Sequence, residues 1–229
     1  MSNERTVERP RQPSPRSGSP RSGSPGRLPR VTLVVAVVVS LVLVYPYIGL
    51  DASESRLSVS GTVHYATLVA HIFTAAVALI LGPLQFMARV RARPRVHRTI
   101  GLVYLLAGVL PAAVTAVPVA LWSGRPVTQV GLTVAAVLWL ITGGLAYRAA
   151  RRRDFTAHRE WMLRNYALTF LAVTARVLVP LLLLIRLPFS TESAATLAPT
   201  LIPFGQTAGW IVNLAVAEVF IRRLRRAGR

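Results

Sequence analysis

Six stretches of this chain are apolar over the length that a helix needs to cross a membrane, and this pattern constrains the fold more than any other feature. The stretches are residues 31–50, 61–87, 99–121, 129–150, 161–187 and 204–221. A helix rises about 1.5 Å per residue, so about 20 apolar residues cross a hydrocarbon core of about 30 Å. Hydrophobic residues make up 53% of the chain and charged residues only 15%, a balance untypical of a soluble domain. We therefore predict an all-α, polytopic membrane protein with six transmembrane helices.

The residues before the first apolar stretch have a different composition. Residues 1–30 are rich in Pro, Ser, Gly and Arg and cannot bury an apolar core, which predicts a disordered basic tail. The apolar stretch that follows is long and ends without a convincing small-residue cleavage site, so we interpret it as a retained helix and not as a signal peptide. Residues 31–229 are then predicted to form one membrane domain.

The distribution of arginine predicts the orientation in the membrane. Of the 27 basic residues, all of them arginine, 23 lie in the tail, in residues 89–98, in residues 148–164 and from residue 222 onward. With six spans these four regions share one side, so the positive-inside rule predicts that both termini face the cytoplasm, in a bacterial cytoplasmic membrane. The net charge of +19 then indicates contact with anionic lipid headgroups at the cytoplasmic face and argues against nucleic acid as a partner.

One arginine lies inside an apolar stretch. Arg176 follows Trp161 by 15 residues, about 22 Å along a helix axis, which places it in the hydrocarbon. A charge at such a depth costs about 2.5–3.5 kcal/mol, so we expect it to face the bundle and find partners. Glu218, near the end of the last stretch, is expected to pair with Arg222, four residues further along the same helix.

Three of the predicted helices carry small and polar residues at a spacing of three and four, which puts them on one face of each helix. On the second helix they are His64, Thr67, His71, Thr74, Ala78 and Gln85. On the third they are His97, Gly101, Tyr104, Gly108, Pro111, Thr115 and Pro118. On the fifth they are His158, Met162, Asn165, Thr169, Ala172 and Arg176. Such faces are typical of helix packing in membranes, whereas ionisable groups on them indicate a function.

Two histidines suit the axial positions of a b-type haem. His97 and His158 open the third and fifth predicted helices after arginine-rich loops, so they lie at one depth on different helices, as the two axial ligands of a haem must. The neighbouring arginines would pair with haem propionates. A metal site would use the same pair with Asp154 or Glu160, but no HExxH motif and no cysteine supports it. We predict haem b as the cofactor and an electron-transfer or quinone-linked role.

A second interpretation centres on His71 and Arg176, which we expect at similar depth from opposite ends of their helices. With Gln85, Tyr104 and Asn165 on the same polar faces, they would bind a quinone oxygen or a small anionic solute, or relay protons. A third interpretation is a structural protein whose polar faces only pack helices. No P-loop, dinucleotide fingerprint or nucleophile elbow appears in the sequence, so it assigns no catalytic residue.

Three motifs carry a resemblance to a known family. They are Gly82-Pro83-Leu84-Gln85-Phe86, His97-Arg98-x-x-Gly101-x-x-Tyr104 and Asp154-x-x-x-His158-Arg159-x-Trp161-Met162-x-Arg164. With them the chain resembles, over roughly residues 65–220, an uncharacterised family of bacterial predicted membrane proteins classed as a domain of unknown function. The resemblance implies a membrane protein and no particular activity. More loosely, the chain is similar to the six-helix cytochrome b561-like proteins, from whose pattern of two well-spaced ligands on each of two helices it departs.

Overall fold

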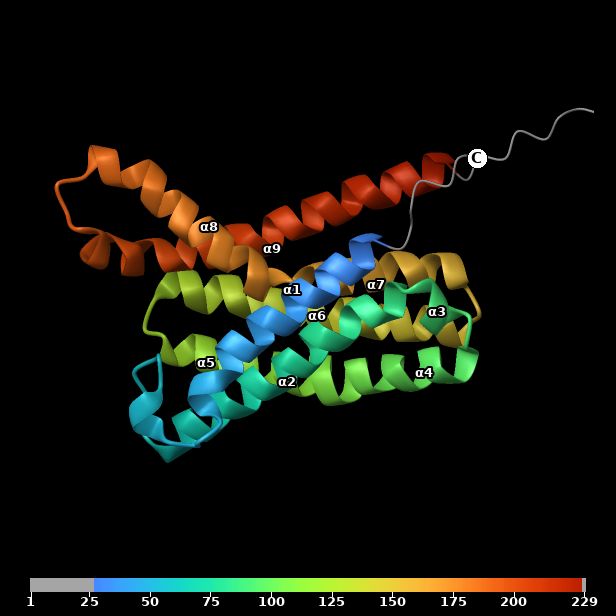
Figure 1. The fold of residues 1–229 in the computed structure, drawn as a ribbon, viewed down its shortest axis with the longest axis horizontal. Coiled ribbons are helices and arrows are strands. Elements are labelled where there is room, and N and C mark those ends of the chain that lie inside the picture. Colours follow the sequence, from blue (N-terminus) through green and yellow to red (C-terminus); the bar gives the residue numbers. More distant parts are fainter. Residues whose placement is uncertain (1–26, 228–229) are drawn as a thin grey trace, which may run out of the picture.

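The computed structural model describes residues 27–227, and all regular elements of this part of the chain are helices (Figure 1). Six helical segments within these residues are long and apolar enough to cross a membrane. The prediction of an all-α membrane protein with six spans is confirmed. The predicted disordered tail lies outside the described residues, except for residues 27–30, which begin the first helix.

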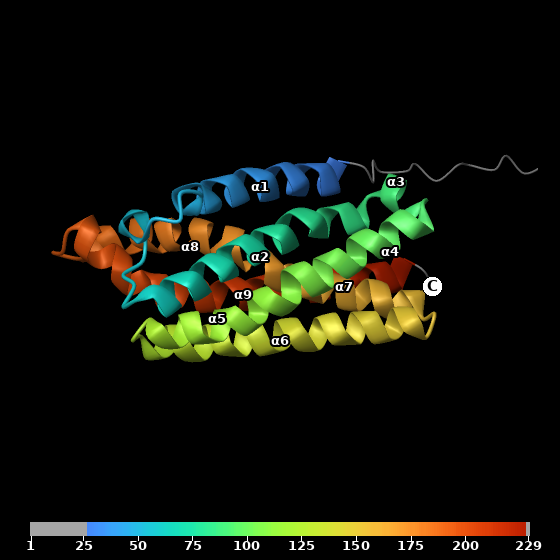
Figure 2. The ribbon, with the colours of Figure 1, turned by 90° about the horizontal axis from the view of Figure 1, so that it is seen from below.

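The first two spans lie side by side (Figure 2). They and the short elements between them are α1 (Arg27–Val44), η1 (Tyr45–Tyr47), η2 (Ala52–Glu54) and α2 (Thr62–Phe86). Ala36 of α1 and Leu79 of α2 are both fully buried and belong to one apolar cluster with Val173. At the far end of α1, Tyr47 and Tyr65 are buried and their ring centroids are 6.4 Å apart. Small and aromatic side chains thus fix α1 against α2.

The third span is a continuous helix with a widened middle. It follows the one-turn helix α3 (Ala88–Arg91), and its parts are α4 (Pro94–Val103), the π-helical η3 (Tyr104–Val109) and α5 (Leu110–Trp122). The N–H of Leu110 donates to the carbonyl of Leu105, five residues back. Pro111 has no N–H to offer the preceding turn, which favours such widening. Gly108 lies against α2 here, because a Cβ on it would come within 3.0 Å of the Ala78 backbone.

The fifth predicted apolar stretch, residues 161–187, forms two helices, and the second of them, with the short turn after it (Leu171–Phe189), is the fifth of the six spans. The remaining elements of the chain are α6 (Pro126–Arg151), α7 (Phe155–Thr169), α8 (Leu171–Arg186), η4 (Leu187–Phe189) and α9 (Ala194–Ala227). At the break after Thr169, the amide of Asn213 in α9 donates to the carbonyl of Ala167 at 3.0 Å and accepts from the hydroxyl of Thr174 at 2.8 Å. One side chain therefore satisfies polar groups on both sides of the break, as a membrane interior requires.

Beyond this break, α8 and the first half of α9 form a hairpin that diverges from the other helices (Figure 1). The hairpin packs closely through small residues, since a Cβ on Gly205 would collide with Val179 and one on Gly209 would come 3.0 Å from Leu171. Four large apolar side chains of α8 are exposed, namely Val177, Leu181, Leu184 and Ile185, whereas the main core lies between α2, η3, α5, α6 and α7.

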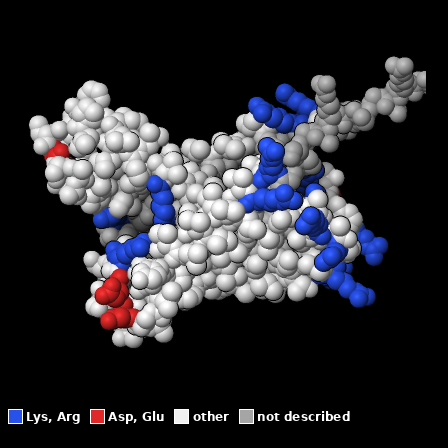
Figure 3. Space-filling model, viewed as in Figure 1, with Lys and Arg blue, Asp and Glu red and all other residues white. Residues whose placement is uncertain are grey.

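The start of α1 and the end of α9 lie at one end of the molecule, together with α3 and the turn between α6 and α7 (Figures 1 and 2). Basic side chains gather on this end, and acidic ones appear at the opposite end (Figure 3). We call the end that carries the basic side chains the arginine-rich end. The structure thus has the charge asymmetry on which the predicted orientation depends, while the side of the membrane itself stays a prediction.

Three helices begin five or more residues before the predicted apolar stretches. They are α4, which begins at Pro94, α7, which begins at Phe155, and α9, which begins at Ala194. Pro94 occupies the first turn of α4, where a missing N–H costs nothing, and the carboxylate of Asp154 accepts from the N–H of Ala157 at 2.9 Å. Capping residues set these ends, and hydropathy alone does not detect them.

Candidate functional site

The histidines of α4 and α7 meet at the arginine-rich end. His97 lies in the first turn of α4 and His158 in the first turn of α7, each following the residue that begins its helix by three positions. Their ring centroids are 6.3 Å apart and their planes are nearly perpendicular, at 87°. Both side chains are partly buried. The two helices therefore present one imidazole each to a shared space.

Hydrogen bonds orient one ring of this pair. Nδ1 of His158 lies 2.9 Å from the carbonyl oxygen of Ala146 in α6. A carbonyl only accepts, so Nδ1 carries the proton and Nε2 keeps its lone pair. Such a carbonyl contact is the usual support of a metal-bound imidazole. Nδ1 of His97 is buried without a hydrogen-bond partner, and neither Nε2 has a partner among residues 27–227.

A buried amide lies one helical turn from His97. Gln85, near the end of α2, is 4% exposed, and its Nε2 has no hydrogen-bond partner. Its Oε1 would lie 3.2 Å from a Cβ on Gly101, so the side chain packs against α4 there. Gly101 follows His97 by four residues, on the same helix face. Two unpartnered buried nitrogens, in Gln85 and His97, therefore lie near one another, and such groups call for an explanation.

Tyr104 and Asn165 are joined to each other in the core. The hydroxyl of Tyr104 donates to Oδ1 of Asn165 at 2.6 Å and lies 2.8 Å from the hydroxyl of Thr169. Nε1 of Trp139 donates to the same Thr169 oxygen at 2.9 Å, and Nδ2 of Asn165 donates to the Trp139 carbonyl at 2.7 Å. Both Tyr104 and Asn165 are 0% exposed. These contacts fix η3, α6 and α7 together, and the network satisfies its own polar groups.

The structure does not join His71 to Arg176. Nδ1 of His71 donates to the carbonyl of Ala112 at 2.9 Å and ties α2 to α5. Nη1 of Arg176 donates to the carbonyl of Ala172 in its own helix at 2.6 Å. Arg176 is exposed, whereas we expected it to face the bundle. The reason is the divergence of α8, which turns this part of the helix away from the core.

An ion-pair cluster that the sequence pattern did not predict lies between α7 and α9. Nε of Arg164 lies 2.5 Å from a carboxylate oxygen of Glu218, and Nε of Arg225 donates to Glu160 at 2.6 Å. The prediction that Glu218 pairs with Arg222 is wrong, because the carboxylate is directed across to α7. The Arg225 guanidinium holds the pKa of Glu160 below its usual range. Only the placement of α7 beside α9 could have revealed these pairs.

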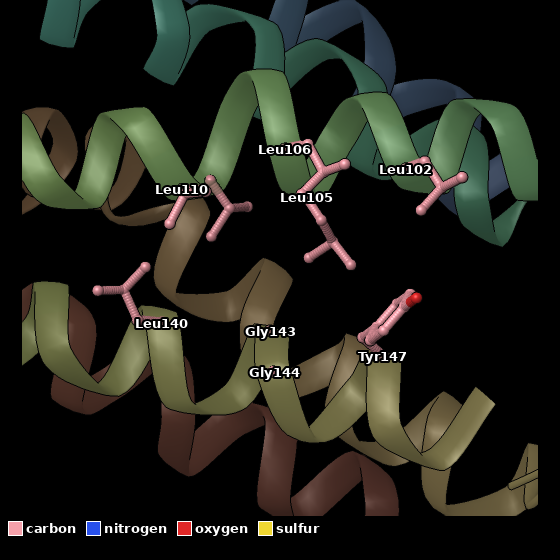
Figure 4. Close-up of a pocket in the computed structure, with 9 residues that line it drawn as sticks. Leu102, Leu105, Leu106, Leu110, Leu140, Gly143, Gly144 and Tyr147 are labelled. Carbon is pink, nitrogen blue, oxygen red and sulfur yellow. The ribbon is translucent and has the colours of Figure 1, made fainter. Parts of the chain in front are cut away.

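An apolar groove runs between the third span and α6 (Figure 4). Its volume is about 360 Å³. It is lined mainly by Leu102, Leu105, Leu106 and Leu110 on one side and by Leu140, Gly143, Gly144 and Tyr147 on the other. Tyr147 directly follows Ala146, whose carbonyl holds His158. The groove therefore leads along the helices toward the level of the two imidazoles.

A family model described as a predicted membrane protein (DUF2306) matches residues 68–221. The match includes all seven predicted site residues, which are His71, Gln85, His97, Tyr104, His158, Asn165 and Arg176. No curated protein and no solved structure matches the chain.

Proposed function

This chain belongs to the DUF2306 family of predicted membrane proteins, and on that premise we propose that it is an electron-transfer module of the bacterial cytoplasmic membrane. His97 and His158 are the residues that would hold a b-type haem. When bound, the haem would supply one-electron redox chemistry.

The distance between the two rings carries this proposal. A metal-bound imidazole nitrogen lies about 2 Å from its ion, so two rings on opposite sides of one ion have centroids about 6 Å apart. The observed separation is 6.3 Å. The bond from Nδ1 of His158 to the Ala146 carbonyl leaves Nε2 as the ligating atom.

The number of protein ligands favours haem over a bare metal ion. Among residues 27–227, no group of three or more His, Cys, Asp or Glu side chains could hold a metal. A structural zinc ion takes four protein ligands and a catalytic one takes three. A haem iron needs only axial ligands from the protein, because the porphyrin supplies the other four nitrogens. Two histidines are sufficient for that chemistry and insufficient for zinc.

The surroundings of the pair suit the rest of a haem. The arginines of residues 89–98 and Arg159 lie next to the two histidines in the sequence, and guanidinium groups bind carboxylates such as haem propionates bidentately. The unpartnered Nε2 of Gln85 is a further donor at this level. The leucine-lined groove would accommodate the apolar tail of a quinone, which we propose as the electron partner.

The test is the absorption spectrum of the full chain, purified in detergent after expression with a haem supply. We expect a Soret band that shifts on reduction with dithionite. His97→Ala and His158→Ala should each remove most of this absorbance, while His64→Gln should retain it, because His64 contacts Trp122 at the opposite end. Size-exclusion profiles identify variants that fail to fold.

The proposal fails if the full chain shows no Soret band under conditions in which a known haem protein of the membrane keeps its haem. It fails equally if both histidine variants fold and retain the absorbance.

A further inference from the structure

Arg176 is a charged side chain on an otherwise apolar helix. It lies in α8, ten residues or about 15 Å before Arg186 at the helix end. Its side chain is exposed, and the hydrogen bond from Nη1 goes to the backbone of its own helix. A guanidinium has five N–H donors, so most of the hydrogen-bond donors of Arg176 are unused.

No acidic side chain among residues 27–227 forms a salt bridge with Arg176. The salt bridges of this region involve Glu160 and Glu218, both at the arginine-rich end. Asp51 accepts from Ser53 within its own loop. A charge inside the hydrocarbon costs about 2.5–3.5 kcal/mol unless it is paired. An anion from outside the described residues would remove that cost.

A second arginine lies near Arg176. Arg56, in the loop between α1 and α2, is positioned by its backbone N–H, which donates to the hydroxyl of the buried Tyr47 at 3.3 Å. The loop that carries Arg56 and the helix that carries Arg176, α8, both lie toward the end of the bundle opposite α3 (Figure 1). Figure 3 shows basic side chains around a hollow at the end of the molecule opposite the arginine-rich end, below the diverging hairpin. An anion between two such groups would turn their repulsion into attraction.

Apolar side chains continue from Arg176 along α8. The helix leaves α1 and α2 after Val173, which is 8% exposed. Val177 is 62% exposed, Leu181 48% and Leu184 69%. The site thus combines cationic groups with an adjacent apolar wall, which is the chemistry of a lipid with an anionic headgroup.

We propose that Arg176 and Arg56 bind the phosphate of an anionic phospholipid, whose acyl chains lie along the exposed face of α8. Arginine suits this role because its planar group donates two parallel hydrogen bonds to phosphate oxygens. The lipid would fill the space between the α8–α9 hairpin and α1, at the end of the bundle opposite the histidine pair. This site is independent of haem.

The test measures thermal unfolding of the full chain in detergent against added phosphatidylglycerol, with phosphatidylcholine and inorganic phosphate as alternative probes. We expect phosphatidylglycerol to stabilise the protein more than the other two do. Arg176→Gln should weaken its apparent affinity roughly ten-fold, through the loss of charge-assisted hydrogen bonds. Arg176→Lys should retain part of the effect, since it keeps the charge.

Arg186→Gln is the matched control, because Arg186 is an exposed arginine at the end of the same helix. Its response to phosphatidylglycerol should equal that of the unchanged protein. The proposal is overturned if Arg176→Gln folds and keeps the full response, or if inorganic phosphate alone reproduces it. A dimer that forms without lipid and hides Arg176 would overturn it as well.

Discussion

At the scale of single residues, the buried hydroxyl of Tyr104 belongs to the hydrogen-bond network that joins η3, α6 and α7. We expect Tyr104→Phe to lower the free energy of unfolding by about 1–2 kcal/mol, because Oδ1 of Asn165 loses the donor at 2.6 Å while remaining buried. Denaturant titration in mixed micelles would measure this loss. Tyr45→Phe is the control, since Tyr45 is 75% exposed, and it should change stability little. An equal effect of the two substitutions would contradict the structural role of the network.

Glu160 links stability to pH. The hydrogen bond from Arg225 is the main cause of the lowered pKa of Glu160, whose usual value is 4.5. A lowered pKa in the folded state means that the pair stabilises the fold above pH 4.5 and loses this contribution as the pH falls through the folded value. We therefore expect acid to destabilise the unchanged protein more than Glu160→Gln, as followed by thermal unfolding between pH 7 and pH 3. Parallel pH profiles would refute this.

Helix counting from the sequence placed His97 and His158 at one level, and their rings lie 6.3 Å apart. Residue spacing did not predict the ion-pair partner of Glu218, because spacing along one helix reveals only partners on that helix. The observed partner, Arg164, approaches from α7. It also gave no indication that Arg176 would be exposed, since exposure depends on where α8 points. Residue positions along a helix were thus predictable, and contacts between helices largely were not.

At the scale of elements, the close approach of η3 to α2 depends on a glycine. We expect Gly108→Ala to lower the free energy of unfolding by about 1–3 kcal/mol, because its Cβ would lie 3.0 Å or less from the backbone of Ala78. Gly144→Ala in α6 is the matched control, since a Cβ there meets nothing within 4 Å. It should leave stability unchanged or raise it slightly. Similar losses in both variants would disprove the packing argument.

The existence of the six spans was predictable from hydropathy, because each must satisfy the length and polarity of a bilayer core. The break after Thr169, within the fifth predicted stretch, was not predictable in this way, since no proline or glycine lies there. It is stabilised by Asn213, which is 44 residues further along the chain. Element boundaries that depend on such remote partners need the assembled structure.

At the scale of the whole molecule, the even number of spans puts both termini on one side of the membrane, and the excess of arginine on that side predicts that it is cytoplasmic. A fluorescent protein fused after residue 229 should therefore fluoresce, and alkaline phosphatase fused there should be inactive. The same reporters placed in residues 190–193, between η4 and α9, should give the reverse result. Active phosphatase at the carboxyl terminus would invalidate the orientation.

The position of the histidine pair has a consequence for any electron that reaches it. Both imidazoles lie in the first turn of their helices, so nearly the full length of α4 to α5 separates them from the opposite aqueous phase. Most of a hydrocarbon barrier about 30 Å thick lies on that side. A haem held there, as proposed above, would exchange electrons with one aqueous compartment and with carriers dissolved in the lipid, and would not by itself conduct electrons through the membrane.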